Sequence, residues 1–232
     1  MDIRGIAQRA IDELQFRFDV FPTLHYQPLP WLGLNTAMRG EGTEARWQVI
    51  EQSLDNSIKT ALDIGCNVGY FCFSLALKRI PTLGVEMDDR LLRIARYAAR
   101  KLQVPGVGFC NLLIDRNTVA LLPQADLVLL LSVWHHWVRA YGLEDASQML
   151  AAVWKRSNKV LFFETGEAEM PPEFGLLALK TSARAWLEDY LRATCSDATV
   201  TWAGSFKAFA PHGNEVEKVA YRNLFKLVRI NG

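Results

Sequence analysis

The sequence predicts an α/β fold in which a mostly parallel sheet carries helices on both faces, and three observations support this. Apolar runs alternate with helical patterns between about residues 60 and 165, as they do in β-α-β units. Residues 127–133 are almost wholly apolar, which is typical of a strand covered on both faces. Residues 61–71 read as a buried strand, a glycine turn and the start of a helix.

The remaining elements follow in chain order. Residues 1–55 are expected to form a helical cap, with apolar residues at helical spacing from Ile3 to Phe18, a proline-rich loop and a second helix from Thr43. Further strands are expected at 82–85, 107–114, 127–133 and 159–163, and helices at 90–102 and 145–154. A helix at 182–191 and a strand pair at 199–209 and 216–230 complete the sheet. We therefore expect one domain over 1–232, with a cap (1–55), a core (56–165) and a sheet-completing part (166–232).

Composition restricts the class of protein. Half of the residues are hydrophobic and the net charge is +1, so no overall field favours nucleic acid or a membrane. The four cysteines form no C-x-x-C pair, and no apolar run reaches about 18 residues, which predicts reduced thiols in a cytoplasmic protein without a membrane span. Cations of the second half are scattered and are interpreted as solvated; they are Lys155, Arg156, Lys159, Lys218, Arg222, Lys226 and Arg229. The oligomeric state stays open.

The glycine turn suggests a ligand. Gly65 and Gly69 bracket three residues, and Asp63 lies two positions before the first glycine. Glycine lets a backbone turn tightly and approach a ligand, and the N-terminus of the following helix favours anionic or polar groups. The spacing differs from the G-x-G-x-x-G fingerprint of dinucleotide-binding folds, which argues against a nicotinamide-dependent oxidoreductase.

Polar residues lie where the predicted strands end. The carboxyl ends of parallel strands share one edge of a sheet, where ligands bind. Glu86 ends the second strand, 23 residues after Asp63, and is placed to accept both hydroxyls of a ribose. Asp115 ends the third, and either it or Asn111 is a candidate acceptor for an adenine amino group. Residues 164–167 follow the fifth strand and either line an acceptor pocket or form a solvated loop.

These motifs together resemble those of class I S-adenosylmethionine (SAM)-dependent methyltransferases over about residues 55–165. The resemblance implies a Rossmann-like sandwich with a seven-stranded, mostly parallel sheet and an antiparallel last strand. Asn67 stands where many members have glycine, which requires either a turn without positive φ at this position or an asparagine that tolerates positive φ. The implied cofactor is S-adenosyl-L-methionine, and the implied binding residues are Asp63, Gly65, Cys66, Asn67, Gly69, Tyr70, Glu86, Met87, Asp115 and Ser132.

A narrower resemblance concerns the acceptor. Residues 131–138 are similar to the methyltransferase half of bacterial O-antigen chain-terminating methyltransferase/kinases, which methylate a phosphate at a polysaccharide end, and residues 65–69 also resemble RNA γ-phosphate capping methyltransferases. The expected function is methyl transfer to an oxygen, either a phosphate or a hydroxyl of a sugar-containing or other small substrate. A non-catalytic SAM-fold subunit that binds a protein partner, and a methyltransferase acting on RNA, remain alternatives.

The acceptor decides which side chains are needed. A hydroxyl needs a base, for which His135 or His136 is the candidate, whereas a phosphate or carboxylate is already ionised. Adjacent histidines do not face the same way, so one is expected in the site and the other in the core. Tyr26, Arg39 and Arg46 are candidates for binding the substrate, because the resemblance implies a lid over the substrate in this part of the chain. An arginine there is a two-pronged donor to anions. No metal site is expected.

Overall fold

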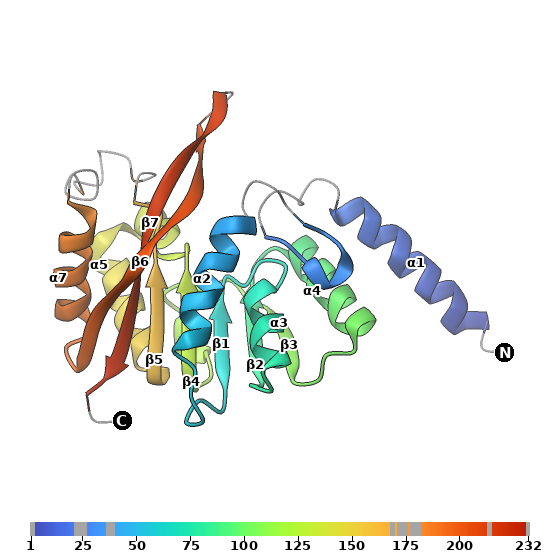
Figure 1. Ribbon diagram of the computed structural model, residues 1–232, viewed down its shortest axis with the longest axis horizontal. Coiled ribbons are helices and arrows are strands. Elements are labelled where there is room, and N and C mark those ends of the chain that lie inside the picture. The colour runs from blue at the N-terminus through green and yellow to red at the C-terminus, as the bar shows by residue number, and fades with distance from the viewer. Residues whose placement is uncertain are drawn as a thin grey trace.

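The computed structural model describes residues 3–20, 27–35, 40–167, 170, 176, 182–212 and 215–230. In this part of the chain seven strands form one sheet in the order β3-β2-β1-β4-β5-β7-β6 (Figure 1). The strands are β1 (Ala61–Ile64), β2 (Thr82–Glu86), β3 (Val107–Asn111), β4 (Ala125–Leu131), β5 (Ser157–Glu164), β6 (Ala198–His212) and β7 (Glu215–Arg229). Neighbours among β1 to β5 pair in parallel, and β7 is antiparallel to β5 and β6. The predicted fold class is confirmed.

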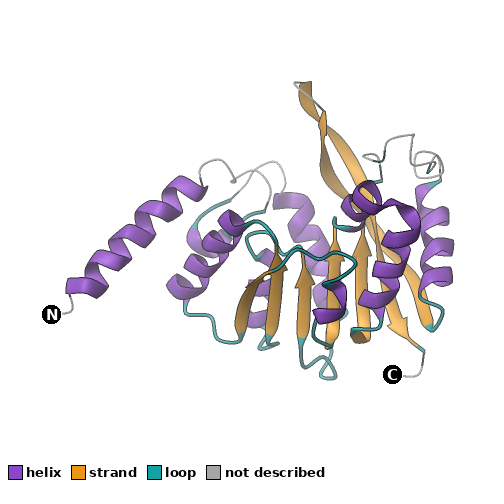
Figure 2. Cartoon of the chain, turned by 180° about the vertical axis from the view of Figure 1, so that it is seen from behind, coloured by secondary structure: helices purple, strands orange, loops and turns teal. Residues whose placement is uncertain are grey.

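Helices cover both faces of this sheet, with α2 and α3 in front of it in Figure 1 and α5 in front of it in Figure 2. Successive residues of β4 pack alternately against the helices on the two faces of the sheet. Leu127 and Leu129 belong to the apolar cluster of α2 and α3, while Val128 and Leu130 belong to the cluster of α5 and α7. The helices are α1 (Ile3–Val20), α2 (Gly40–Gln52), α3 (Tyr70–Leu77), α4 (Asp89–Leu102), α5 (Trp134–Trp154) and α7 (Ala183–Thr194), with short 3-10 turns η1 (Pro30–Leu32) and η2 (Val119–Leu121).

The third strand is shorter than the sequence predicts. β3 ends at Asn111, the residue paired with Glu86, which is the last residue of β2. Because β2 ends there, the chain beyond Asn111 has no further strand partner, and the amide of Leu112 makes one last bond to the carbonyl of Glu86. Asp115 therefore lies in the loop after β3, and the expectation that it ends the strand is wrong.

The helix predicted at 145–154 begins much earlier, at Trp134. The strand predicted at 127–133 ends at Leu131 instead, so that Ser132 and Val133 connect β4 to α5. A break at Gly142, with φ 85° and ψ 169°, separates two helical pieces within α5. Glycine adopts this conformation without steric cost, which lets the chain change direction between the pieces.

The β6–β7 hairpin continues past the carboxyl end of β5, as Figure 1 shows. β7 pairs with β5 only as far as Leu224, opposite Glu164, and earlier residues of β7 pair with β6 alone. This extension carries Lys207 and Arg222 beyond the sheet edge. α2 packs closely against it, because a Cβ at Gly42 would lie 2.1 Å from the carbonyl oxygen of Lys207.

α1 packs against α4 at the other end of the sheet (Figure 1). The contact combines charge with aromatic stacking. Arg93 of α4 donates to Asp19 of α1 at 2.9 Å, and the rings of Phe16 and Tyr97 stack with centroids 4.1 Å apart. None of the described helices is both long and apolar enough to cross a membrane.

Candidate active site

The turn after β1 has an unusual backbone. Gly65, Asn67 and Gly69 all have positive φ, at 72°, 54° and 89°. Asn67 tolerates this because its side-chain oxygen accepts a hydrogen bond from the Val68 amide at 2.9 Å. A Cβ at Gly65 would lie 2.5 Å from Cγ2 of Val133, so no other residue fits without displacing that side chain. The turn thus exposes bare backbone to the space beside it.

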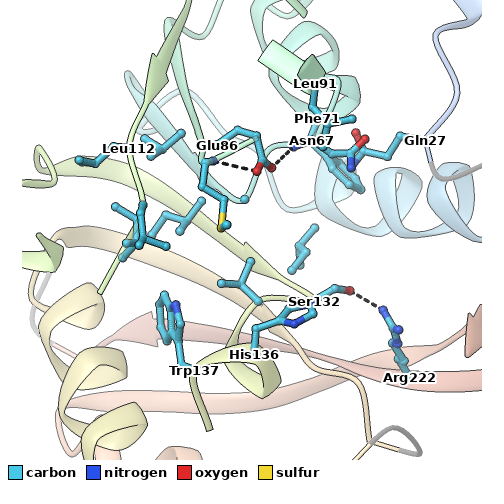
Figure 3. A pocket seen from close by; sticks show the side chains of 18 of the residues that line it. Gln27, Asn67, Phe71, Glu86, Leu91, Leu112, Ser132, His136, Trp137 and Arg222 are labelled. Carbon is cyan, nitrogen blue, oxygen red and sulfur yellow. Dashed lines mark hydrogen bonds between the residues drawn. The ribbon is translucent and has the colours of Figure 1, made fainter. Parts of the chain in front are cut away.

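Glu86 is held beside this turn by backbone amides. Its Oε2 accepts from the amide of Asn67 at 3.0 Å, and its Oε1 accepts from the amides of Met87 at 2.8 Å and Asp88 at 3.0 Å. Figure 3 shows the bonds from Asn67 and Met87. Three amide donors fix the carboxylate at the edge of the sheet, where it remains able to accept hydroxyl groups.

Asp63 and Cys66 lie beneath the turn. Asp63 is buried and accepts a hydrogen bond from Sγ of Cys72 at 3.3 Å. Burial raises the pKa of Asp63 to about 7. The hydrogen bond from Cys72 lowers this pKa in part, and the negative charge of Glu86 raises it by a smaller amount. Gly84 makes room for both sulfur atoms, because a Cβ added at this position would lie 2.7 Å from Cys66 Sγ and 2.8 Å from Cys72 Sγ. This layer supports the turn from below.

A cavity of about 590 Å³ opens above the turn, within the range of roughly 300–1,000 Å³ typical of small-molecule sites (Figure 3). Of the residues predicted for the site, seven line it: Arg46, Gly65, Asn67, Glu86, Met87, Ser132 and His136. Asp63, Cys66, Gly69, Tyr70, Asp115 and His135 are not among its lining residues. Tyr26 and Arg39 lie outside the described residues.

The wall next to Glu86 is apolar. Met87, Leu91 and residues 112–114 line it. Asp115 adjoins this wall, but its Oδ1 accepts from the amides of Asn117 and Thr118, at 2.8 and 2.9 Å, in the loop that leads into η2. These bonds, with the backbone bond from Thr118 the largest cause, lower the pKa of Asp115. Its role at an adenine ring stays a prediction.

The two adjacent histidines have different environments. His136 is exposed and lines the cavity together with Trp137 and Tyr141. His135 is buried, and its Nδ1 accepts a hydrogen bond from the amide of Gly166 at 3.0 Å. Burial lowers the pKa of His135 well below its usual value, and the neighbouring His136 ring adds to this. His135 is therefore a neutral ring that holds the loop after β5.

On the side of the cavity away from Glu86, the carboxylate of Glu164 connects Arg46 to Ser132. It is fully buried at the end of β5, and both its oxygens accept from Nη1 of Arg46, at 2.8 and 3.0 Å. Ser132, at φ 62°, donates its hydroxyl to Glu164 at 2.7 Å and accepts from Nη1 of Arg222 at 2.6 Å. The network joins α2, the ends of β4 and β5, and β7.

The expectation that Arg222 is solvated is wrong. The sequence pattern favours a solvated face for it, but it is 5% exposed and lines the cavity. Lys207, Thr43 and Gln27 line the cavity as well and were not predicted. No signal in the sequence identifies Lys207 or Arg222, because a cation in a strand has the same local pattern whether it faces solvent or a cavity. Among the described side chains, no group of three or more His, Cys, Asp or Glu is arranged to hold a metal ion.

Comparison with known proteins agrees with this geometry. Residues 62–162 match a family model described as a methyltransferase domain. The O-antigen chain terminator bifunctional methyltransferase/kinase WbdD of Escherichia coli is 27% identical over 113 residues, covering 46% of this chain and 16% of that protein. A crystal structure of WbdD matches with a TM-score of 0.65 and 21% identity, covering 88% of this chain and 44% of that one.

A second protein of similar structure was solved with its cofactor bound. Magnesium protoporphyrin IX methyltransferase (ChlM) from Synechocystis, solved with bound SAM, matches with a TM-score of 0.54 and 16% identity, covering 81% of this chain and 77% of that one. This chain spans less than half the length of the WbdD chain that it matches. Its sheet order, with an antiparallel β7, is that of the class I methyltransferase fold. Residues 62–162 therefore resemble a methyltransferase domain, and the structural neighbour ChlM binds S-adenosyl-L-methionine on the same fold.

Proposed function

We propose that this protein transfers the methyl group of SAM to an oxygen atom of an acceptor bound in the same cavity. The observation that carries the proposal is that one cavity is lined by the glycine turn and Glu86 on one side and by Ser132, His136 and Arg222 on the other (Figure 3). A methyl donor and an acceptor bound on these two sides would meet within one cavity, and in-line displacement requires that the reacting atoms be held close together and aligned.

The cofactor side fits SAM. Gly65 leaves no room for a Cβ, so the cofactor would approach bare backbone at the turn. Glu86 would accept the ribose hydroxyls, and Met87 with the apolar wall would pack against the adenine. Bound SAM supplies a methyl group on a positively charged sulfur, which makes that carbon electrophilic. Asp63 and Cys66 would act indirectly, by supporting the turn.

The acceptor side would position and hold the nucleophilic oxygen. Arg46, with a side chain that is 12% exposed, would bind a negatively charged substrate group. His136 would contact the acceptor and, for a hydroxyl acceptor, remove its proton. His135, neutral and bonded to Gly166, would position the loop after β5 instead of reacting.

The class of acceptor is proposed from the relatives. WbdD is, by its name, an O-antigen chain terminator, and we extend this to a sugar-containing acceptor with a phosphate or hydroxyl oxygen. Tyr26 and Arg39 of the N-terminal cap are retained as proposed substrate-binding residues. The same cap supplies Arg46 and Thr43 to the cavity.

Titration calorimetry with S-adenosylhomocysteine tests the cofactor side. We expect micromolar binding by the intact protein and loss of binding in Glu86→Ala and Asp63→Ala, with circular dichroism to confirm that both variants fold. Glu188→Ala removes an acid from an ion pair on α7, away from the cavity, and should bind normally. Absence of binding by the intact protein would overturn the proposal.

Methyl transfer is then measured with methyl-labelled SAM and three acceptor pools, namely phosphorylated sugars, neutral sugars and RNA. Label in either sugar pool supports the proposal. Label in RNA alone makes the protein an RNA methyltransferase. Cofactor binding without label in any pool favours a non-catalytic subunit.

A further inference from the structure

We propose that Arg46 and Arg222 together form an oxyanion site for the methyl acceptor, and that Glu164 is the positioning residue that holds both guanidinium groups. The accepting oxygen then belongs to a phosphate or carboxylate group and not to a neutral hydroxyl. This inference rests on the proposed function and specifies the acceptor that it leaves open.

Arg46 reaches the site from α2. Its Nη1 donates to both oxygens of Glu164, its Nε donates to the carbonyl of Gly42 at 2.9 Å, and its Nη2 donates to the hydroxyl of Thr43 at 3.4 Å. A guanidinium carries five N–H donors in a rigid plane. These contacts fix that plane and leave one Nη2 donor of Arg46 without an acceptor among the described residues.

Arg222 reaches the same place from β7, on the hairpin that extends past β5. Its side chain is 6% exposed, and its Nη1 lies 2.6 Å from the Ser132 hydroxyl and 3.8 Å from Oε1 of Glu164. Figure 3 shows the guanidinium pointing towards Ser132 at the side of the cavity opposite Glu86. Arg46 and Arg222 therefore lie around one carboxylate and line one cavity.

Glu164 explains how two cations are tolerated side by side. Its carboxylate lies within bonding or ion-pair distance of both guanidinium groups, and Ser132 links it to Arg222. Charged groups held rigidly in a site of low polarity interact more strongly with an incoming charge than the same groups in water. Lys207 of the hairpin also lines the cavity, and its Nζ forms an ion pair with Glu41 at 3.2 Å.

An anionic oxygen changes what the reaction requires. An oxygen lone pair forms the new O–C bond while the C–S bond breaks, and the electron pair of that bond stays on sulfur. The acceptor loses one negative charge and the sulfonium loses its positive charge, so charge balances and no proton is released. His136 is then a contact residue, and no general base is needed.

Binding of simple anions tests the site without knowledge of the natural substrate. The protein, saturated with S-adenosylhomocysteine, is titrated with phenyl phosphate, benzoate and neutral benzyl alcohol, and binding is followed by ligand-observed NMR. We expect at least one anion to bind ten or more times more tightly than benzyl alcohol. A preference for phenyl phosphate assigns a phosphate acceptor, and a preference for benzoate assigns a carboxylate.

Variants identify the residues. Arg46→Met and Arg222→Met should each weaken anion binding at least tenfold, whereas Arg192→Met, which removes an exposed arginine on α7, should leave it unchanged. Glu164→Gln should lower the ratio of anion to alcohol affinity at least fivefold while S-adenosylhomocysteine still binds. Ser132→Ala, a milder change to the same network, should lower this ratio in the same direction if Glu164→Gln does not fold.

The two proposals fail in different ways. If the intact protein does not bind S-adenosylhomocysteine, the proposed function is overturned before any probe is added. If the cofactor product binds but benzyl alcohol binds as tightly as both anions, only the oxyanion site is overturned. Unchanged anion affinity in both arginine variants would have the same meaning.

Discussion

Arg46 on α2 and Glu164 at the end of β5 are 118 residues apart in the sequence and are joined by hydrogen bonds of 2.8 and 3.0 Å. The carboxylate is fully buried and the arginine side chain is 12% exposed. This pair links the N-terminal part of the chain to the centre of the sheet. Arg46 of this pair also lines the cavity, so the pair can affect both stability and ligand binding.

Glu164→Gln should reduce the free energy of unfolding by about 3–5 kcal/mol, because it leaves the buried guanidinium of Arg222 and the largely buried one of Arg46 without a carboxylate partner. Urea unfolding followed by fluorescence measures this. Glu188→Gln is the matched control, since its partner Arg192 is exposed and such pairs contribute about 0–1 kcal/mol. Equal effects of the two substitutions would show that Glu164 does not hold the network together.

Gly65→Ala should weaken binding of S-adenosylhomocysteine at least about tenfold, a change of ~1.4 kcal/mol. The new Cβ would lie 2.5 Å from Val133, and alanine is strained at φ 72°. Calorimetry gives the affinity. Gly33→Ala is the control, because Gly33 has the same φ of 72° but nothing within 4 Å of its Cβ position. Weakened binding in Gly33→Ala as well would assign the effect to strain in general and not to the turn.

The two histidines should respond differently to the same substitution. His135→Ala removes the acceptor of the Gly166 amide from a buried position and should cost about 1–3 kcal/mol of stability. His136→Ala, at an exposed position, should change stability by about 0.5 kcal/mol or less. Thermal and urea unfolding compare them. A large loss of stability in His136→Ala would contradict its assignment to the cavity surface.

Asp63 should make stability depend on pH. Its pKa is about 7 in the folded protein, whereas the ordinary pKa of an aspartate is 3.8, so the unfolded chain loses this proton first as the pH rises. The contribution of Asp63 to the free energy of unfolding is therefore fully present below about pH 4. It is lost as the pH rises towards 7. Asp63→Asn lacks this titration, so its stability relative to the native protein should rise between about pH 4 and about pH 8, by up to about 4 kcal/mol.

Urea unfolding of both proteins across this range provides the measurement. The asparagine side chain of the Asp63→Asn variant would be able to keep the bond from Cys72, because its amide oxygen is also an acceptor. Comparing the variant with the native protein at each pH removes the contributions of other groups, including His135, whose lowered pKa acts in the opposite direction. A constant difference across the range would mean that Asp63 titrates normally.

The sequence by itself determined the sheet and the proposed cofactor side of the site. The turn and its following helix are formed within residues 61–77, and Glu86 ends the next strand, so short-range patterns contain most of this side. Parallel pairing then brings β1 and β2 together, with Ile64 opposite Val85. The prediction that Asp115 ends a strand was wrong, because the length of β3 depends on where its partner β2 ends.

Only the tertiary structure decided how the side chains of the proposed acceptor side are arranged. Arg46, Ser132, Glu164 and Arg222 come from α2, the end of β4, β5 and β7, and they meet because β7 inserts between β5 and β6 and extends past the sheet edge. The local sequence around Arg222 is that of an ordinary exposed strand residue. Its burial depends on strand register and on a carboxylate 58 residues earlier in the chain. Long-range contacts of this kind have no local signature, which is why the cofactor was predictable and the arrangement of cations around Glu164 was not.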